Sequence, residues 1–408
     1  MGLKGSPGIV KKGLLKNNPV VSTGMRLLKT YMMVLAMIIV FAIFTILQPR
    51  MISPSNISNI LVENAYIIVL AVGMLICIVT AGNIDLSIGS VTGFIAAIAG
   101  ILIINNGVNF WLALVICLLL GIAIGAWQGF WIAYMRIPAF IVTLSGMMMW
   151  RGITQWINSK EIMVSGEPLF KKLFYYGITD NIAVVFSIAA LIVSLYVGLK
   201  IFNRIRKAKK GYKNQHIVWT IISCCLVTAA TFALAFTFIS EDITKLNRGI
   251  PAVLVTLSIV ILAYSYFTSK TVYGRQIYAI GGNEKAAKLS GVNTNRMIFF
   301  GYANMGFLCA VAAFMVLGFL SQATTGLGTG YELEAIAACY IGGASAYGGR
   351  GKVSGVIIGA LFMGIINKGM TMIDAGDYAQ YITLVVKGAI LLVAVAFDII
   401  SKRRGKTV

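Results

Sequence analysis

The chain has 408 residues, of which 59% are hydrophobic and only 12% are charged. Soluble domains carry about 25% charged residues, so this composition, repeated in apolar blocks of about 17 to 25 residues, excludes a soluble protein and indicates a polytopic membrane protein. The net charge of +21 does not indicate nucleic-acid binding, because the basic residues cluster in short segments between the apolar blocks.

About twelve apolar blocks predict an all-α fold, a polytopic transmembrane helical bundle in a single domain over residues 1–408. Residues 1–29 form a basic N-terminal tail before the first block. That block is longer than a signal-peptide core and lacks a small-residue cleavage site, so we expect an uncleaved span. The weakest blocks can be re-entrant. In chain order the twelve blocks are Tyr31–Leu47, Glu63–Thr80, Ile88–Ile104, Trp111–Tyr134, Ala139–Ile157, Ile182–Phe202, Ile217–Ile239, Pro251–Phe267, Met297–Leu320, Leu333–Tyr347, Val353–Ile373 and Tyr378–Ile400.

The charges between the blocks give a check on this topology. If the N-terminus is cytoplasmic and each block crosses once, five basic clusters fall on the cytoplasmic side, where Lys and Arg are enriched. Both termini are therefore predicted to be cytoplasmic. The basic clusters contain Arg136, Lys200 to Lys213, Lys285 to Arg296, Arg350 with Lys352, and Lys402 to Lys406, whereas the acidic Glu167, Asp180, Glu241 and Asp242 fall outside.

A polar interruption at Thr80–Ser90 carries Asn83, Asp85 and Ser87 between two apolar blocks. Polar backbone at a membrane boundary is tolerated where protein or a water-filled cavity covers it. These residues are therefore candidates for a translocation pathway. The alternative is an ordinary turn in which Asp85 caps the next helix.

Two segments share a short sequence. Ile137–Ser145 matches Ile250–Ser258 at seven of nine positions, and the proline in each predicts the start of a helix. By the topology above, the two copies cross in opposite directions. Transporters are often built from internal repeats, so an inverted repeat is compatible with this match but is not established by it.

The longest polar segment of the second half is 271–296. Within it Asn283 can cap the N-terminus of a helix and Gly291 can end it, which predicts about two helical turns. A helix this short is marginal alone in water. We therefore expect it to be ordered by the adjacent spans or by a partner, with a solvated connecting helix as the alternative.

A second polar interruption, Ser321–Glu334, places Glu332 and Glu334 at the outer mouth of a short helix. Acids are favourable near a helix N-terminus, and they can equally meet basic residues of an external partner. Among the ionisable residues inside apolar blocks, Lys368 is the best candidate for a buried charge. We expect Arg151 and Lys387 to extend toward a membrane surface, and Asp374 and Asp377 to lie in an external turn.

No nucleotide or metal site is expected in the chain. Gly348–Lys352 resembles a phosphate-binding loop, but Ala346 stands where the Walker pattern needs glycine and Val353 where it needs Ser or Thr. The six cysteines lie in apolar blocks without a zinc-binding spacing, so we expect them to be buried free thiols. No array of carboxylates and histidines crosses the membrane, which disfavours proton coupling, while sodium coupling is harder to exclude.

Four ordered stretches resemble the bacterial sugar ABC importer permeases, the family of the ribose, arabinose, galactose and xylose permeases. The stretches are AGNIDLSIGS, IPAFIVTLSGMMMWRGI, GGNEKAAKLSGVNTNR and GTGYELEAIAACYIGGASAYGGRGKVSG, within a similarity that covers most of Ile52 to Ile400. Residues 180–248 depart from the ribose type as a family-variable insertion of two spans. This longer form resembles the xylose and multiple-monosaccharide permeases.

The resemblance implies a homodimer in the bacterial cytoplasmic membrane, related in architecture to the vitamin-B12-type importers. It also implies a cytoplasmic ATPase with tandem nucleotide-binding domains, which holds ATP and Mg, and an extracytoplasmic sugar-binding protein. The chain itself would be a transport subunit without cofactor or catalytic residues. The implied ATPase-coupling residues are Gly281, Gly282, Asn283, Glu284, Ala287, Leu289 and Gly291 in the loop 271–296.

The expected function is therefore ATP-driven import of a monosaccharide, xylose-like or one of several. Two alternatives stay open. The first is an ion-coupled secondary sugar transporter acting alone, and the second is an ABC permease for nucleosides or another furanose.

Overall fold

The structure is a computed structural model that describes residues 19–158, 161–174, 182–209, 217–239, 251–373 and 381–390, together with 392, 393 and 396. Its first half contains α2 (Pro19–Leu47), a 3₁₀ turn (Pro49–Ile52), α3 (Pro54–Glu63), α4 (Ala65–Ala81), α5 (Ile88–Gly100) with a π turn (Ile101–Asn105), α6 (Phe110–Ala133), α7 (Ala139–Ile157), β1 (Ile162–Met163), α8 (Pro168–Phe174) and α9 (Ile182–Lys209). Its second half contains α10 (Ile217–Ile239), α11 (Ala252–Lys270), α12 (Val272–Gly282), α13 (Glu284–Leu289), α14 (Thr294–Leu320), β2 (Gln322–Ala323), α15 (Tyr331–Ile341) and α16 (Val353–Met372), followed by a helical segment at 381–390.

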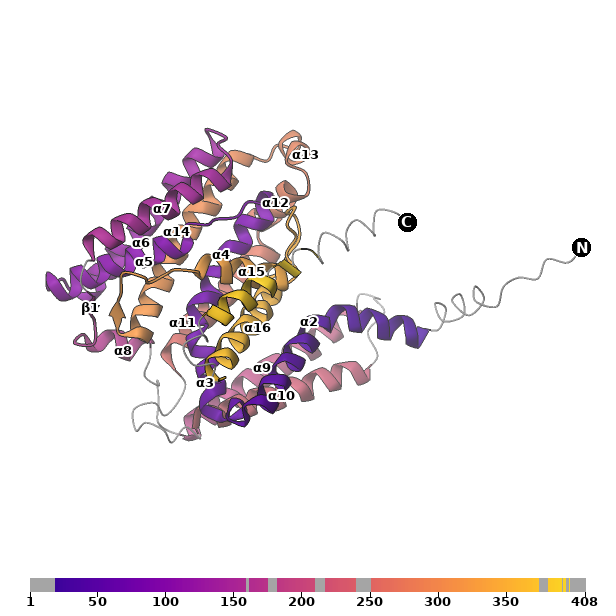
Figure 1. Cartoon of the computed structure of the whole chain (residues 1–408). Helices are drawn as coiled ribbons and strands as arrows, with labels where there is room; N and C mark the ends of the chain where they lie inside the picture. The colour runs from indigo at the N-terminus through magenta and orange to yellow at the C-terminus, as the bar shows by residue number, and fades with distance from the viewer. Residues whose placement is uncertain are drawn as a thin grey trace, which may run out of the picture.

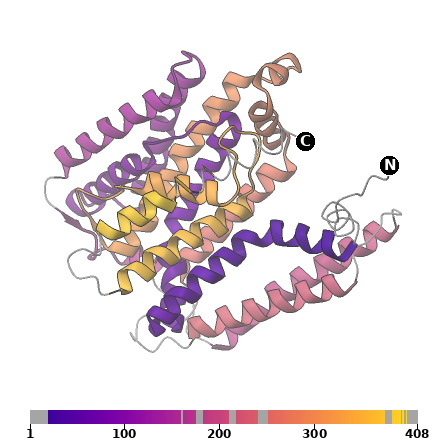
Figure 2. The ribbon, with the colours of Figure 1, turned by 45° about the vertical axis from the view of Figure 1, so that its right-hand side comes forward.

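The helices form a bundle around α4 and α14 (Figures 1 and 2). By length and composition, six helices in the described residues can cross a membrane, or seven if α3 and α4 form one span bent by 40°. The predicted polytopic helical architecture is therefore confirmed. The block predicted at Leu333–Tyr347 is different, because α15 has only eleven residues and a loop follows it. Asp374, Asp377 and the basic C-terminal residues lie outside the described residues.

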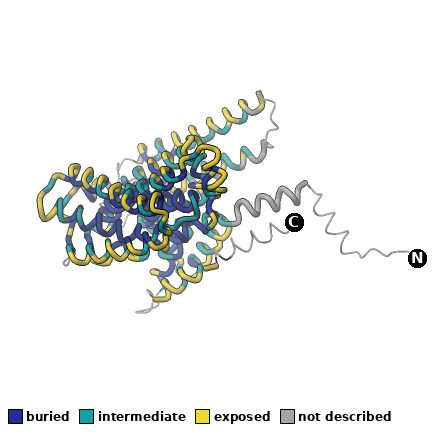
Figure 3. The backbone as a smooth tube through the Cα atoms, turned by 90° about the horizontal axis from the view of Figure 1, so that it is seen from above, coloured by how far each residue is buried: buried dark blue, intermediate teal, exposed yellow. Residues whose placement is uncertain are grey.

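The core of the bundle is dominated by α4, which is apolar on all sides. Apart from Tyr66 and Ala81, every residue of α4 is buried, as expected for a helix without a polar face. α14 packs against α6 through small residues: a Cβ on Gly121 would lie 2.4 Å from the carbonyl oxygen of Gly306. Such close backbone approach is typical of helix pairs in membranes. Figure 3 shows the resulting buried centre and exposed periphery.

The two copies of the repeated sequence both begin helices, as predicted. Pro138 and Pro251 directly precede α7 and α11, with nearly identical backbone angles of φ −53°, ψ 130° and φ −57°, ψ 132°. α7 begins near α13, because Arg136 contacts Glu284, whereas α11 ends next to α12 and α13. The two helices therefore run in opposite directions relative to that end of the bundle.

α9 and α10, the described helices of the variable segment 180–248, form a hairpin beside the bundle (Figure 2). They pack on each other, and α10 also contacts α3. Only 11% of the apolar window Val184–Arg206 is buried inside the protein. The hairpin therefore leaves most of its apolar surface outside the bundle.

Candidate functional site

The segment 271–296 forms two short helices whose ends are set by local hydrogen bonds. The Thr271 side chain accepts from the Gly274 amide at 3.0 Å and begins α12. The Asn283 side chain accepts from the Ala286 amide at 3.0 Å and begins α13, and Gly291, with φ +84°, follows its end. The predicted cap, the predicted termination and the length of about two turns are confirmed.

α13 is fixed to the bundle by Arg136, in the loop between α6 and α7. One guanidinium nitrogen of Arg136 donates to Glu284 Oε1 at 2.7 Å, and the other donates to Asn295 Oδ1 and, at 3.5 Å, to Thr294 Oγ1. Arg136 has φ +58°, a left-handed conformation that is rare for a residue with a side chain. The α6–α7 loop, α13 and the start of α14 are thus joined by one side chain.

The ion pair with Arg136 predicts a specific pH dependence. Its hydrogen bond holds the pKa of Glu284 below its ordinary value of 4.5. Because the folded-state pKa is lowered, the stabilisation is complete above that ordinary value and is lost only as the pH falls through the lowered one. Hydrogen exchange at 283–291, corrected for the intrinsic rate, should therefore show unchanged protection between about pH 8 and pH 6. Loss of protection within this range in the wild type but not in Glu284→Gln would contradict the assignment.

The predicted ATPase-coupling residues do not all face outward. Leu289 is 90% exposed, and Gly282, Asn283 and Gly291 are also exposed. Ala287 was predicted on this surface, but it is buried against Ile280 and Met297 because α13 packs that side on its own chain. Glu284 is half-buried against Arg136. Ala287 and Glu284 therefore position α13, and Leu289 is its most exposed apolar side chain.

Gly281 also faces inward. A Cβ at this position would lie 1.8 Å from the carbonyl oxygen of Val79, at the end of α4, and 2.3 Å from the amide nitrogen of Gly349. That amide donates to the Val79 carbonyl at 2.9 Å. Nothing lies within 4 Å of a Cβ built on Gly282. Gly281 thus permits α12, α4 and the loop 342–352 to meet by their backbones.

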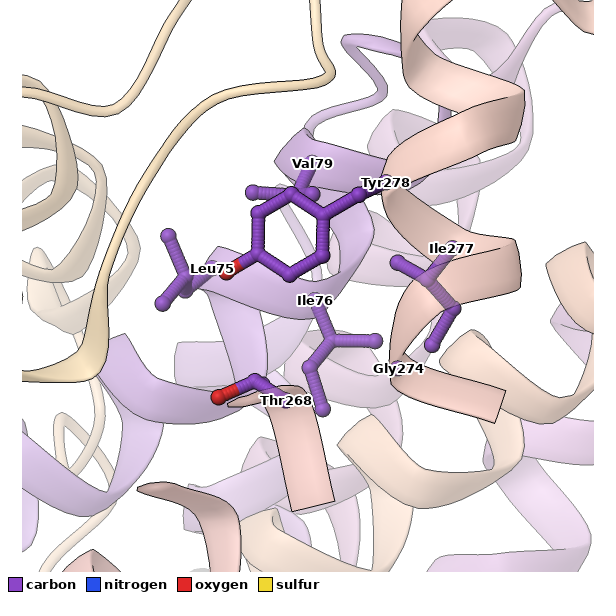
Figure 4. Close-up of a pocket in the computed structure, with 7 residues that line it drawn as sticks. All are labelled: Leu75, Ile76, Val79, Thr268, Gly274, Ile277 and Tyr278. Atoms are coloured by element: carbon purple, nitrogen blue, oxygen red, sulfur yellow. The ribbon is translucent and has the colours of Figure 1, made fainter. Parts of the chain in front are cut away.

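A small apolar cavity of about 10 Å³ lies under this junction, between α4 and the elbow of α11 and α12 (Figure 4). Beside it, the Tyr278 hydroxyl donates to the Gly351 carbonyl oxygen at 2.7 Å. Arg136, α12, α13 and the loop 342–352 therefore lie at one end of the bundle, as the charge pattern predicts. The cavity is lined by Leu75, Ile76, Val79, Thr268, Gly274, Ile277 and Tyr278.

The polar residues before α5 bond to each other. Asp85 Oδ1 accepts from the Ser87 amide at 2.9 Å and from the Ser87 hydroxyl at 2.6 Å, while Gln128 of α6 donates to Ser87 Oγ at 2.8 Å. Asn83 is half-buried nearby in sequence. This geometry favours the turn interpretation for Asp85 and Ser87. Gln128 was not predicted, although it is the one strongly polar side chain of α6.

The two acids of α15 pair with basic residues of the same chain. Glu332, only 6% exposed, lies 3.6 Å from Arg151 Nη2 of α7. Glu334 lies 2.5 Å from Lys387 Nζ and accepts from Asn367 at 3.3 Å. Arg151 and Lys387, which were expected to extend toward a membrane surface, are thus each held by an acid of the same chain. Neither acid is free at an outer rim, because each compensates a cation from another helix.

Lys368 is a partly buried charge, as predicted, and its ammonium lies 2.8 Å from Glu63 Oε1. Glu63 is the last residue of α3, next to the bend at Asn64. This pair joins α16 to α3. The sequence places Glu63 at the start of an apolar block and gives no sign of its partner Lys368.

The pair of Arg151 and Glu332 should be visible in stability. Arg151→Leu leaves the buried Glu332 carboxylate without its cation, which we expect to cost about 1–3 kcal/mol. Thermal unfolding in detergent should show a lower midpoint for Arg151→Leu, and Arg151→Leu with Glu332→Gln should recover most of the loss. Arg296→Leu, at an exposed position, serves as the control. Equal midpoints for Arg151→Leu and the control would show that the pair contributes nothing.

Comparison with known proteins shows which family the chain belongs to. Residues 56–395 match the family described as "Branched-chain amino acid transport system / permease component". The chain belongs to this permease family. The xylose transport system permease protein XylH of Escherichia coli K12 is 35% identical over 92% of this chain and 93% of its own length. XylH of Haemophilus influenzae Rd is 34% identical over 92% of this chain and 98% of its own, and the ribose import permease protein RbsC of Escherichia coli K12 is 32% identical over 89% and 92%. No solved structure matches.

Membership settles the general role of the chain. It is the permease subunit of an ABC importer in the bacterial cytoplasmic membrane and not an enzyme. A permease component of such a system works with an ATPase and a substrate-binding protein.

Proposed function

We propose that the permease carries a monosaccharide, xylose-like or one of several, into the cytoplasm, driven by an ATPase with tandem nucleotide-binding domains. Relatives named for xylose and ribose transport support the sugar. The proposal rests mainly on α13. Leu289 of this capped helix is 90% exposed, and Arg136 holds the start of the helix through Glu284. An exposed leucine on a fixed helix suits docking into a cleft of another subunit. ATP and Mg would be held by that ATPase, with no cofactor in the permease.

The proposed topology has about twelve passes in a single domain over 1–408, with both termini and α13 in the cytoplasm. The gathering of Arg136, α12, α13 and the loop 342–352 at one end supports this orientation. Opposite directions of α7 and α11 support it as well. The proposed architecture is that of the vitamin-B12-type importers.

A second copy of the permease is proposed to cover α7. Arg151 lies about 18 Å along this helix, and its side chain is 32% exposed on the surface of the subunit. A charge at that depth is costly against lipid, and it normally faces protein or a water-filled path. We infer that Arg151 and Glu332 border the pathway between two copies, while Asp85, Ser87, Glu334 and Lys368 hold the helices around it.

Reconstitution tests the proposal. Vesicles containing the permease, its ATPase and sugar-loaded binding protein should accumulate labelled xylose only with ATP and Mg. The permease alone, under a sodium or proton gradient, should accumulate none. Uptake by the permease alone would overturn the ATP-driven mechanism in favour of an ion-coupled carrier. ATP-dependent uptake of a nucleoside and of no sugar would overturn the substrate assignment.

A further inference from the structure

The hairpin of α9 and α10 is strongly basic and has no acid of its own. Seven Lys and Arg residues lie between Lys200 and Lys213, and the sequence has no Asp or Glu between Asn181 and Ser240. The apolar window of α9 is almost entirely outside the protein interior. The hairpin therefore has most of its apolar surface outside the bundle, and its positive charge is not balanced by acids of its own.

Two of these cations face α10 rather than solvent. The Lys200 ammonium lies 3.5 Å from Ser223 Oγ and 5.6 Å from the centre of the Tyr196 ring. One turn further, Arg204 donates to Thr220 Oγ1 at 3.0 Å. Ser223 donates its own hydroxyl proton to the Thr220 carbonyl at 2.9 Å, which leaves its oxygen directed at Lys200. Two cations of α9 and two hydroxyl groups of α10 therefore form one polar cluster where the two helices meet, called the α9–α10 cluster below.

The length of α9 gives the depth of the α9–α10 cluster in a bilayer. Its 28 residues extend for about 42 Å, whereas the hydrocarbon core of a bilayer is about 30 Å thick. Lys200 and Arg204 lie about 27 to 33 Å from the start of the helix. For a helix that enters the hydrocarbon near Ile182, this is the level at which the hydrocarbon gives way to the phosphates of the lipid headgroups.

We propose that the α9–α10 cluster of Lys200, Arg204, Thr220 and Ser223 binds the phosphate of an anionic phospholipid from the cytoplasmic leaflet. Arg and Lys form charge-assisted hydrogen bonds to phosphate oxygens, and the hydroxyl groups can complete the shell. The acyl chains then lie on the exposed apolar faces of α9, including Leu195 and Leu199. Anionic headgroups attract basic segments beside membrane spans. The site belongs to the variable segment and does not depend on which sugar is carried.

The test measures how much phosphatidylglycerol the detergent-purified permease retains, by native mass spectrometry during titration with this lipid. Lys200→Gln with Arg204→Gln should weaken retention by about tenfold or more. Arg206→Gln with Lys209→Gln removes the same charge from the same helix at exposed positions outside the α9–α10 cluster, and it should change retention by less than about threefold. Thermal unfolding without lipid confirms that both variants are folded.

Three results would overturn the proposal. Equal losses in the two double variants would show diffuse attraction to charge and no site. Unchanged retention in Lys200→Gln with Arg204→Gln would show that lipid binds elsewhere. If this variant instead loses affinity for the ATPase in lipid-free detergent while retaining phosphatidylglycerol, the α9–α10 cluster is a protein contact.

Discussion

Gly281→Ala is expected to lower the unfolding temperature of the permease, whereas the same change at the next residue is expected to be harmless. A Cβ at position 281 would overlap the carbonyl oxygen of Val79 and the amide of Gly349, and these are backbone atoms that cannot rotate away. Overpacking of this kind costs about 1–3 kcal/mol. The change also forces α12 away from the end of α4.

Gly282→Ala is the matched control for this prediction. Its Cβ meets nothing within 4 Å, and alanine favours helix over glycine by about 1 kcal/mol. Thermal unfolding of both variants in detergent, and transport in vesicles, measure the difference. Equal unfolding temperatures for the two variants would contradict the close backbone packing of α4, α12 and the loop 342–352 at Gly281.

Leu289→Asp should weaken the binding of the ATPase without destabilising the permease. Leu289 is 90% exposed in the isolated subunit, so its replacement costs little in folding. If the ATPase buries it, the loss is about 1.5–3 kcal/mol, or at least about tenfold in affinity. Binding of purified ATPase to the permease in lipid nanodiscs measures this, together with ATP hydrolysis stimulated by the loaded binding protein.

Val272→Asp provides the comparison for Leu289→Asp. Val272 is 56% exposed at the start of α12, in the same loop but outside 281–291. We expect this variant to bind the ATPase as the wild type does. If both variants bind normally, α13 is a solvated connecting helix. If both are equally weak, the contact is spread over the whole loop.

Local features of the site were predictable from the sequence, because they depend on neighbouring residues. Asn283 and Gly291 set the ends of α13 through hydrogen bonds and backbone angles within a few residues. The same holds for Asp85, whose partner Ser87 is two residues away. The prolines before α7 and α11 likewise predicted helix starts, because the missing N–H of proline is no loss at the first turn of a helix.

Contacts between distant segments were not predictable. Arg136 meets Glu284 across 148 residues, and a lone arginine in a loop gives no sign of this. The direction of Ala287 depends on how α13 lies on Met297, which two turns of helix do not specify. Arg151 and Lys387 looked like residues that reach for a membrane surface, because their acidic partners lie in a different apolar block. Only the packing of α15 between its neighbours brings these charges together.

The ion pairs of the bundle have a consequence for its biosynthesis. Glu63 and its partner Lys368 are 305 residues apart in the sequence. Glu332, the partner of Arg151, is likewise synthesised much later than Arg151. While the ribosome is still making the second half, the first half therefore holds an unpaired acid and an unpaired base near or within the bilayer. The early helices can insert into the membrane, but these ion pairs cannot form until α15 and α16 have been synthesised. A chain interrupted before α15 therefore keeps Glu63 and Arg151 without the partners that the complete permease supplies.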